Sequence, residues 1–250
     1  MKNQEFSPRE SMERALEHWW VIVLLTVLGG IGGWAFHFNH PPLYEATAVV
    51  TVNMDYQKRQ LSQYEEDYAF GDAAAIATSD DVENQIITEA QLHGIPIEFY
   101  QLRQQMYLER KQSFWELHIR NQNPEIAAEL ANLWAGKFYA ALNTALGHAI
   151  QADQIQTQID AINYSLSTSG APELSPESQT TLQNLTDELS QEQQASLGLI
   201  SIMKFALSGS AVVPHEPVLY DLANLVLAGA CIGFVVSLWV AEILKVQRRD

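Results

Sequence analysis

Residues 40–52 read "HPPLYEATAVVTV" and mark a change from an apolar segment to a strand. Pro41 and Pro42 have no backbone donor, so they end a helix that precedes them. From Tyr44 onward the side chains alternate in character, and the set on one side is Tyr44, Ala46, Ala48 and Val50. Strict alternation is typical of a strand with one buried face. We therefore predict a β-strand over 44–53, joined to the preceding helix with almost no linker.

Two apolar segments lie near the ends of the 250-residue chain. Residues 19–36 contain no Asp, Glu, Lys, Arg or His, and neither do residues 222–241. At 1.5 Å per residue, each segment is long enough to cross a hydrocarbon core of about 30 Å. Trp19, Trp20, Trp34 and Trp239 lie near the segment ends, where amphipathic rings prefer the membrane interface. The sequence predicts transmembrane helices over 19–38 and 222–241.

Two other interpretations of these segments are weaker. A cleaved signal peptide could use "ATA" at 46–48 as its cleavage site, but the apolar run is long for a signal, and "ATA" lies beyond the two prolines inside the strand. Two buried core helices would need a large apolar surface around them. The polar segment between the two runs is too modest to provide it.

Basic residues near the ends of the spans predict the orientation. Three precede the first span and three follow the second, namely Lys2, Arg9, Arg14, Lys245, Arg248 and Arg249. Residues 41–57 and 205–221 contain no Lys or Arg. Because Lys and Arg are retained on the cytoplasmic side, we expect the segments 1–18 and 242–250 to be cytoplasmic. Residues 41–220 would then form a periplasmic or extracellular domain of a multi-pass plasma (inner) membrane protein.

Charge and cysteine content limit the function of this outer domain. Residues 41–221 carry eight Lys/Arg and twenty-four Asp/Glu, which accounts for the whole net charge of −16. Such a surface repels phosphate backbones, so nucleic acid is excluded as a partner. The carboxylates are interpreted as a solvated face. Cys231 is the one cysteine and lies in the second span, so no disulfide forms within the chain.

The first half of the outer domain shows weaker signals. Residues 55–75 are interpreted as a loop or weak helix, and Glu65 to Asp67 lack the spacing of a calcium loop. A helix is predicted after residue 79, with Asp80 as its N-cap, Glu83 completing a capping box and Gly94 ending it. Strands are predicted over 106–111 and 113–120. His118 falls on the polar side of the second of these strands and is expected to face solvent.

The longest periodic signal predicts a helix over 124–166. Asn123 is a good N-cap, and Pro124 suits the first helical position. Apolar residues then recur in steps of three and four over some forty residues, which corresponds to about 60 Å of helix. A second arm at 179–196 would fold back along it as a helical hairpin. A last strand, around 198–207, is expected to pair with 44–53 in one sheet close to the bilayer.

Four stretches, in this order along the chain, resemble a known family. They are "SPRESMERALEHWW" (7–20), "PPLYEATAVVTV" (41–52), "NPEIAAELANLWAGKFY" (123–139) and "AVVPHEPV" (211–218). Together they resemble the Wzz-type chain-length determinants, the polysaccharide co-polymerases. The matching membrane-proximal residues are Pro41, Pro42, Tyr44, Glu45, Ala46, Pro214 and Pro217. Those at the start of the long helix are Asn123, Pro124, Ala127, Ala128, Ala131 and Asn132.

The resemblance implies an α+β membrane protein with an α/β base near the bilayer and a long projecting helix. It implies a ring-like homo-oligomer in the lipid bilayer that regulates the chain length of O-antigen, capsule or exopolysaccharide. Its partners would be a polysaccharide polymerase and the nascent glycan. The fused tyrosine kinase of some members is not expected, because the sequence has no Gly-rich phosphate loop. No catalytic residues, cofactor or metal are expected, since no motif with catalytic or metal-binding spacing is present.

Two questions stay open at the level of sequence. Gly29 and Gly33 form a G-x-x-x-G, as do Gly229 and Gly233, which favours close helix packing within or between chains. Glycines are also simply common in membrane helices. The chain could alternatively act as a transmembrane adaptor that activates a separate cytoplasmic tyrosine kinase, or as an adhesion or scaffold protein with an acidic stalk.

Overall fold

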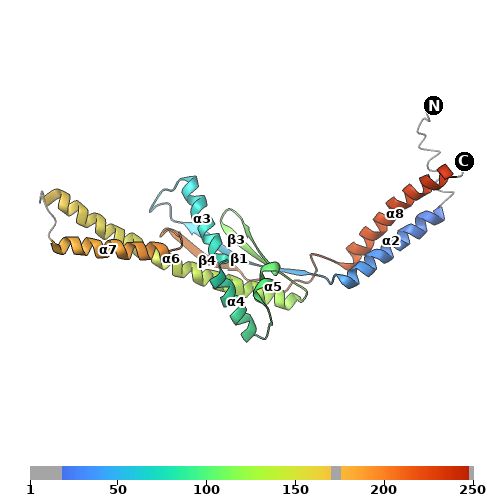
Figure 1. Ribbon diagram of the computed structural model, residues 1–250, viewed down its shortest axis with the longest axis horizontal. Coiled ribbons are helices and arrows are strands. Elements are labelled where there is room, and N and C mark those ends of the chain that lie inside the picture. Colours follow the sequence, from blue (N-terminus) through green and yellow to red (C-terminus); the bar gives the residue numbers. More distant parts are fainter. Residues whose placement is uncertain (1–18, 170–175, 248–250) are drawn as a thin grey trace, which may run out of the picture. The chain divides into compact units, whose positions relative to one another are not determined.

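The computed structural model describes residues 19–169 and 176–247 and divides into two compact units. The helix-pair unit comprises Met1–Tyr44 and His215–Asp250, and the sheet unit comprises Glu45–Pro214. Figure 1 shows a helix near each end of the chain and a mixed helix-and-sheet body between them in sequence. This arrangement confirms the predicted α+β class with two terminal apolar helices. The predicted cytoplasmic segment 1–18 lies outside the described residues, as do 248–250.

The helix-pair unit consists of α2 (Trp19–Asn39) and α8 (Leu222–Gln247). Two windows, Trp19–Asn39 and Leu222–Val240, are long and apolar enough to cross a membrane. Helix α8 continues beyond Ala241, where the predicted span ends, through part of the predicted tail. Leu43 and Leu219 form an isolated antiparallel bridge, so the segments next to the two helices are hydrogen-bonded to each other.

Four strands form one sheet in the order β2-β3-β1-β4. They are β1 (Tyr44–Met54), β2 (Met106–Arg110), β3 (Phe114–Asn121) and β4 (Met203–Gly209). The predicted pairing of the first and last strands is confirmed, since β1 pairs antiparallel with β4 in the register Val52 to Phe205. Strand β4 begins five residues later than the predicted 198, because Leu197 and Gly198 adopt positive φ angles of 51° and 81° and end the preceding helix in a turn.

Three short helices connect β1 to β2. Helix α3 (Gln63–Ala77) was interpreted as loop or weak helix, but a complete capping box between Ser62 and Glu65 begins it. Helix α4 (Asp80–Leu92) is capped by Ser79, whose side chain accepts from the Val82 amide, and not by the predicted Asp80. Helix α5 (Phe99–Gln105) was not predicted. At seven residues it is too short to show a helical period.

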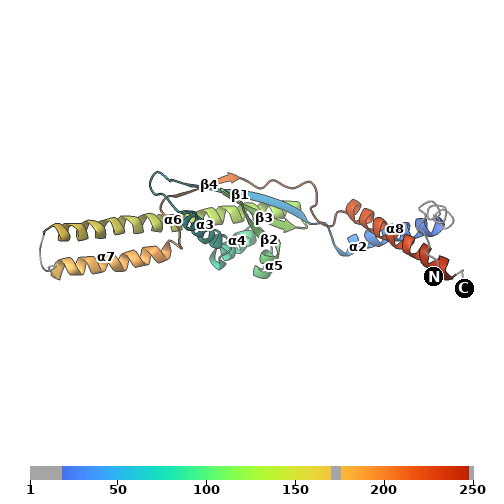
Figure 2. The same cartoon turned by 90° about the horizontal axis from the view of Figure 1, so that it is seen from above.

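The long helix α6 runs over Pro124–Ser169, and α7 runs over Pro176–Ala195. Figure 2 shows the two lying side by side in opposite directions, as a hairpin. The 46 residues of α6 correspond to about 70 Å of helix. The first half of α6 packs on the sheet, where Leu130, Phe138 and Leu142 are fully buried. The second half pairs with α7, in which no residue is buried.

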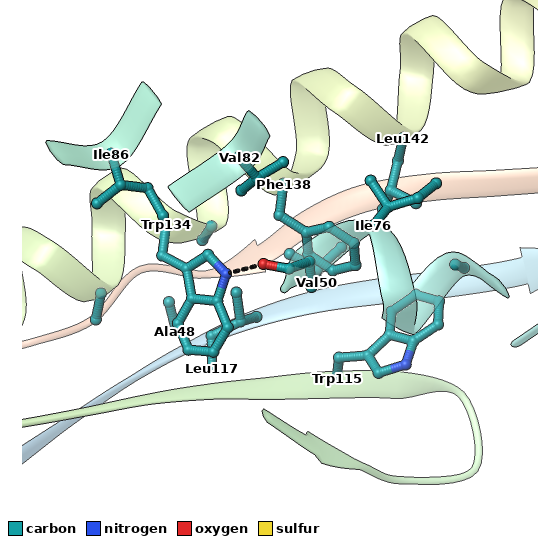
Figure 3. Packing of buried hydrophobic residues seen from close by; sticks show 14 of the residues in the cluster. Ala48, Val50, Ile76, Val82, Ile86, Trp115, Leu117, Trp134, Phe138 and Leu142 are labelled. Carbon is teal, nitrogen blue, oxygen red and sulfur yellow. Dashed lines mark hydrogen bonds between the residues drawn. The ribbon is translucent and has the colours of Figure 1, made fainter. Parts of the chain in front are cut away.

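The core lies between α6 and the inward face of the sheet, with α3 and α4 closing it (Figure 3). Ala46, Ala48, Val50 and Val52 are buried on every second position of β1, as the alternation predicts. Trp115 and Trp134 are both completely buried. The Trp115 ring packs edge-on against Phe138, with centroids 5.6 Å apart. This packing leaves the other face of the sheet to polar side chains.

Candidate functional site

The predicted glycines of the two apolar helices lie at the contact between α2 and α8. A Cβ added at Gly29 would collide with the carbonyl oxygen of Gly229 and would lie 2.9 Å from the Cα of Gly233. A Cβ at Gly33 would collide with the Leu225 carbonyl. Only glycine permits backbones to approach this closely. The structure thus places both G-x-x-x-G pairs in a contact within one chain.

The glycines around these positions have different surroundings. A Cβ at Gly30 would make ordinary contacts with Val226 and Ala230, the latter at 3.9 Å. A Cβ at Gly32 would have no neighbour within 4 Å among the described residues. The close approach is therefore specific to the two predicted pairs and is not a general property of the glycine-rich segment.

The start of α6 carries the second group of predicted residues. The Asn123 side chain accepts from the amides of Glu125 and Ile126 at 2.8 and 3.2 Å, as an N-cap does. Ala127, Ala128 and Ala131 are buried, and their small side chains let the helix lie close to the sheet. The stretch therefore fixes both the first turn of α6 and its distance from the strands.

Asn132 has a structural role that the sequence pattern alone does not show. Its amide nitrogen donates to the Ala211 carbonyl at 3.1 Å, and its amide oxygen accepts from the Ala211 N–H at 2.8 Å. Both backbone groups of one residue are thus satisfied by one side chain. This pair fastens the segment after β4 to α6, between the strand and Pro214.

We expect Asn132→Ala to destabilise this segment by about 1–3 kcal/mol, because it leaves two backbone groups of the buried Ala211 unpaired. Hydrogen exchange of peptides covering 203–213 measures the effect. Asn143→Ala is the matched control, since Asn143 lies exposed on the same helix and its side chain donates to the Tyr139 carbonyl of the preceding turn. Equal exchange in the two variants would contradict the prediction.

Glu45 and its neighbours form a polar cluster on the sheet face opposite α6. This polar sheet face comprises Glu45 and Thr47 of β1, Tyr107 and Glu109 of β2, and Glu116, His118 and Arg120 of β3. Arg120 donates to one Glu45 oxygen at 2.7 Å, and His118 lies 3.0 Å from the other. Burial acts to raise the pKa of Glu45, but hydrogen bonds from Arg120 and Tyr107 outweigh it, and the pKa lies below its ordinary value.

His118 does not face solvent as predicted, since only 7% of its surface is exposed. The Tyr107 ring stacks on it with centroids 4.3 Å apart and an interplanar angle of 2°. Thr47 and Glu45 cover its Nδ1 edge. The alternation placed His118 on the correct face, but Tyr107 of β2 and the Thr47 and Glu45 side chains of β1 bury it there. Its Nε2 faces the carboxylates of Glu109 and Glu116.

The predicted residues thus fall into separate groups. The glycines, Pro41, Pro42, Tyr44 and Pro217 belong to the helix-pair unit, whereas Glu45, Ala46, Pro214 and the start of α6 belong to the sheet unit.

Sequence reasoning missed the ion pairs that join α4 and α5, in which Arg103 contacts the buried Glu83 at 2.7 Å and Asp80 at 2.6 Å. A basic residue in an unpredicted seven-residue helix gave no signal for this contact.

Comparison with known proteins supports the predicted resemblance for the first third of the chain. Residues 13–90 match the Wzz family, described as chain length determinant protein. The match covers "PPLYEATAVVTV" and the segment that folds as α2, β1 and α3. The stretches at 123–139 and 211–218 lie outside it.

Two solved structures resemble the chain at low identity. A full-length bacterial polysaccharide co-polymerase is 10% identical over 95% of this chain and 97% of its own, with a TM-score of 0.41. A mutant of the Shigella flexneri lipopolysaccharide O-antigen chain-length regulator WzzBSF is 10% identical over 70% of this chain and 99% of its own, with a TM-score of 0.21. No curated protein sequence matches the chain.

Proposed function

We propose that the chain is a chain length determinant of the Wzz family, a non-enzymatic regulator of the length of a surface polysaccharide. The observation that carries the proposal is the family match over residues 13–90. Within that match a helix apolar enough to span a membrane leads directly into a strand of the outer domain. We place residues 45–214 on the periplasmic or extracellular side of the plasma (inner) membrane and both chain ends in the cytoplasm.

In this proposal the protein acts as a homo-oligomer beside the polysaccharide polymerase. The hairpin of α6 and α7 offers a long exposed surface for neighbouring subunits or for the nascent glycan, since α7 buries none of its residues within one chain. The paired apolar helices would hold each subunit in the bilayer. The protein needs no bond chemistry for this role, because it acts by contact with the polymerase or its product.

Deleting the protein is expected to broaden the length distribution of the surface polysaccharide and remove its preferred length. Polysaccharide extracted from the deletion strain and separated by gel electrophoresis measures this, and re-expression of the intact chain is the control that restores the distribution. An unchanged distribution in the deletion strain would refute the proposed function. Alkaline phosphatase fused to either end of the intact chain tests the cytoplasmic location of both ends independently, and we expect both fusions to be inactive.

A further inference from the structure

Three potential metal ligands come together on the polar sheet face. One ligand atom from each of Glu109, Glu116 and His118 lies within 4.8 Å of the other two. Strand pairing places them there, because Glu109 is opposite Glu116 and Tyr107 is opposite His118 in the β2–β3 register. All three side chains therefore project from neighbouring positions on the same face of a two-stranded ladder. Glu116 and His118 are two residues apart in β3 and Glu109 comes from β2, so the group depends on strand pairing and matches no metal-binding sequence motif.

The imidazole of His118 is oriented in the way that metal-binding histidines usually are. Its Nδ1 lies 3.0 Å from a Glu45 carboxylate oxygen and 2.9 Å from the Thr47 hydroxyl oxygen. Because an ionised carboxylate can only accept, the Nδ1–H donates to Glu45. In the neutral ring this leaves the lone pair on Nε2. A carboxylate behind one ring nitrogen, with the other nitrogen free, is the usual support of a histidine that ligates a metal.

The second observation is that Nε2 itself is buried and has no hydrogen-bond partner among the described residues. Only 7% of the His118 surface is exposed, so leaving a polar ring nitrogen unpaired is costly. The atom points toward the two carboxylates, at 3.5 Å from Glu116 Oε2 and 3.7 Å from Glu109 Oε2. Two ligands on a tetrahedral zinc ion, each about 2.0–2.1 Å from it, lie about 3.3 Å apart. The observed separations are close to this value.

We propose that His118, Glu109 and Glu116 bind a divalent transition-metal ion, Zn²⁺ being the probe of choice, on the outer face of the sheet. One imidazole and two carboxylates suit such an ion, and solvent completes its coordination. Glu109 is half exposed and Glu116 about one-quarter exposed, so water reaches the ion. The bound ion joins β2 to β3 and has a structural role.

Lys111 is the one cation that contacts these carboxylates within the described residues, and its position is compatible with the ion. It contacts the Oε1 atom of Glu109, whereas the Oε2 atom faces His118. Its ammonium group is 3.8 Å from Glu116 Oε2. On Glu109 the lysine can therefore stay on Oε1 while the ion binds Oε2, whereas on Glu116 it approaches the same Oε2 atom that faces His118. Its positive charge weakens binding, so Lys111→Gln is expected to raise the affinity for Zn²⁺.

The test is zinc binding by the full chain, purified in detergent without a histidine tag and stripped with a chelator. We expect about one Zn²⁺ per chain by elemental analysis and by competition with a chromophoric chelator. His118→Gln and Glu116→Gln should each weaken binding at least about tenfold, and Glu45→Gln, which removes the support of the imidazole, about tenfold. Glu109→Gln should also weaken zinc binding. It changes a half-exposed side chain, so among these variants it is the one least able to disturb folding.

His93→Gln is the matched control. His93 also contacts two glutamates, Glu129 at 2.6 Å and Glu89 at 3.8 Å, but its side chain is 43% exposed and, among the described residues, one carboxylate faces its Nε2 instead of two. This variant should bind Zn²⁺ as the wild type does. The proposal is overturned if the wild type retains no zinc at micromolar concentrations, if Glu109→Gln and Glu116→Gln both bind unchanged, or if His93→Gln loses the ion instead. Polysaccharide length in vivo is a separate readout, so failure here leaves the proposed function standing.

Discussion

Replacing Trp134 with alanine is expected to lower the free energy of unfolding of the sheet unit by about 3–5 kcal/mol. Trp134 is completely buried at the centre of the core, between α6, α3 and the strands (Figure 3). Truncation removes a large apolar surface and leaves a cavity that close-packed neighbours fill only in part. Hydrogen exchange of the slowest amides in β1 and β3 measures this free energy in the full chain.

A milder pair of substitutions separates the hydrogen bond of Trp134 from its volume. The indole Nε1 donates to the Ala77 carbonyl at 2.8 Å. Ala77 is the last residue of α3, where helix carbonyls lack partners within the helix. Trp134→Phe therefore leaves this carbonyl without its donor. Trp115 is equally buried, but its Nε1 has no partner among the described residues.

We expect Trp134→Phe to lower the free energy of unfolding by about 1–3 kcal/mol more than Trp115→Phe does. This difference is the penalty for a buried carbonyl that loses its hydrogen bond. The two substitutions remove the same atoms from fully buried sites, so their difference reports the bond to Ala77 together with the removal of the unpaired Trp115 donor. Equal losses of unfolding free energy in the two variants, measured on the same strand amides, would show that Trp134 acts through volume alone. Helix α3 would then not be fastened to α6 by this bond.

Periodic sequence signals that extend over many residues are sufficient to predict an element of this fold and its buried face. The alternation of β1 and the long period of α6 each extend over ten or more residues, and both predicted the buried face. Helix α3 was missed as a definite helix because its apolar residues are mostly alanine, although Ser62 and Glu65 already form the S-x-x-E pattern of a capping box. A weak period combined with a clear capping box is thus sufficient to form a helix here.

The polar sheet face could not be predicted for a different reason. Which residues of β2 and β3 lie opposite one another depends on the tight connection between Arg110 and Phe114, and a shift of one residue would exchange the two faces. The sequence placed His118 on the correct side of its strand. Its burial depends on Tyr107, Thr47 and Glu45, which come from two other strands. Clusters of this kind require the sheet order β2-β3-β1 to be known.

Replacing Gly29 with leucine is expected to separate α2 from α8. A Cβ at this position meets the backbone of Gly229 and Gly233, which cannot move aside as a flexible side chain could. Close backbone packing is the main source of helix association in a bilayer, where lipid offers no hydrophobic advantage to contact. Loss of about 1.4 kcal/mol or more from the association lowers the equilibrium constant for helix pairing at least tenfold.

A disulfide between α2 and α8 measures this population. A Cβ at Gly30 lies 3.9 Å from the Ala230 Cβ, within the range of about 3.5–4.5 Å that a disulfide requires. Gly30→Cys with Ala230→Cys, in a Cys231→Ser background, should cross-link efficiently under oxidation. Adding Gly29→Leu should slow the cross-linking and reduce its yield, because a smaller fraction of the chains has α2 and α8 in contact.

Gly32→Leu is the control for this experiment, because it adds the same side chain to the same helix where no described atom lies within 4 Å. It should leave the cross-link unchanged, and equal loss in both variants would mean that leucine perturbs α2 for reasons other than contact.

The mobility of the product on a gel also decides whether the glycine contact lies within one chain or between chains. A disulfide within one chain leaves a monomer on a denaturing gel, whereas a contact between subunits gives a dimer. Because the glycines of α2 and α8 meet within a single chain, we expect the monomer.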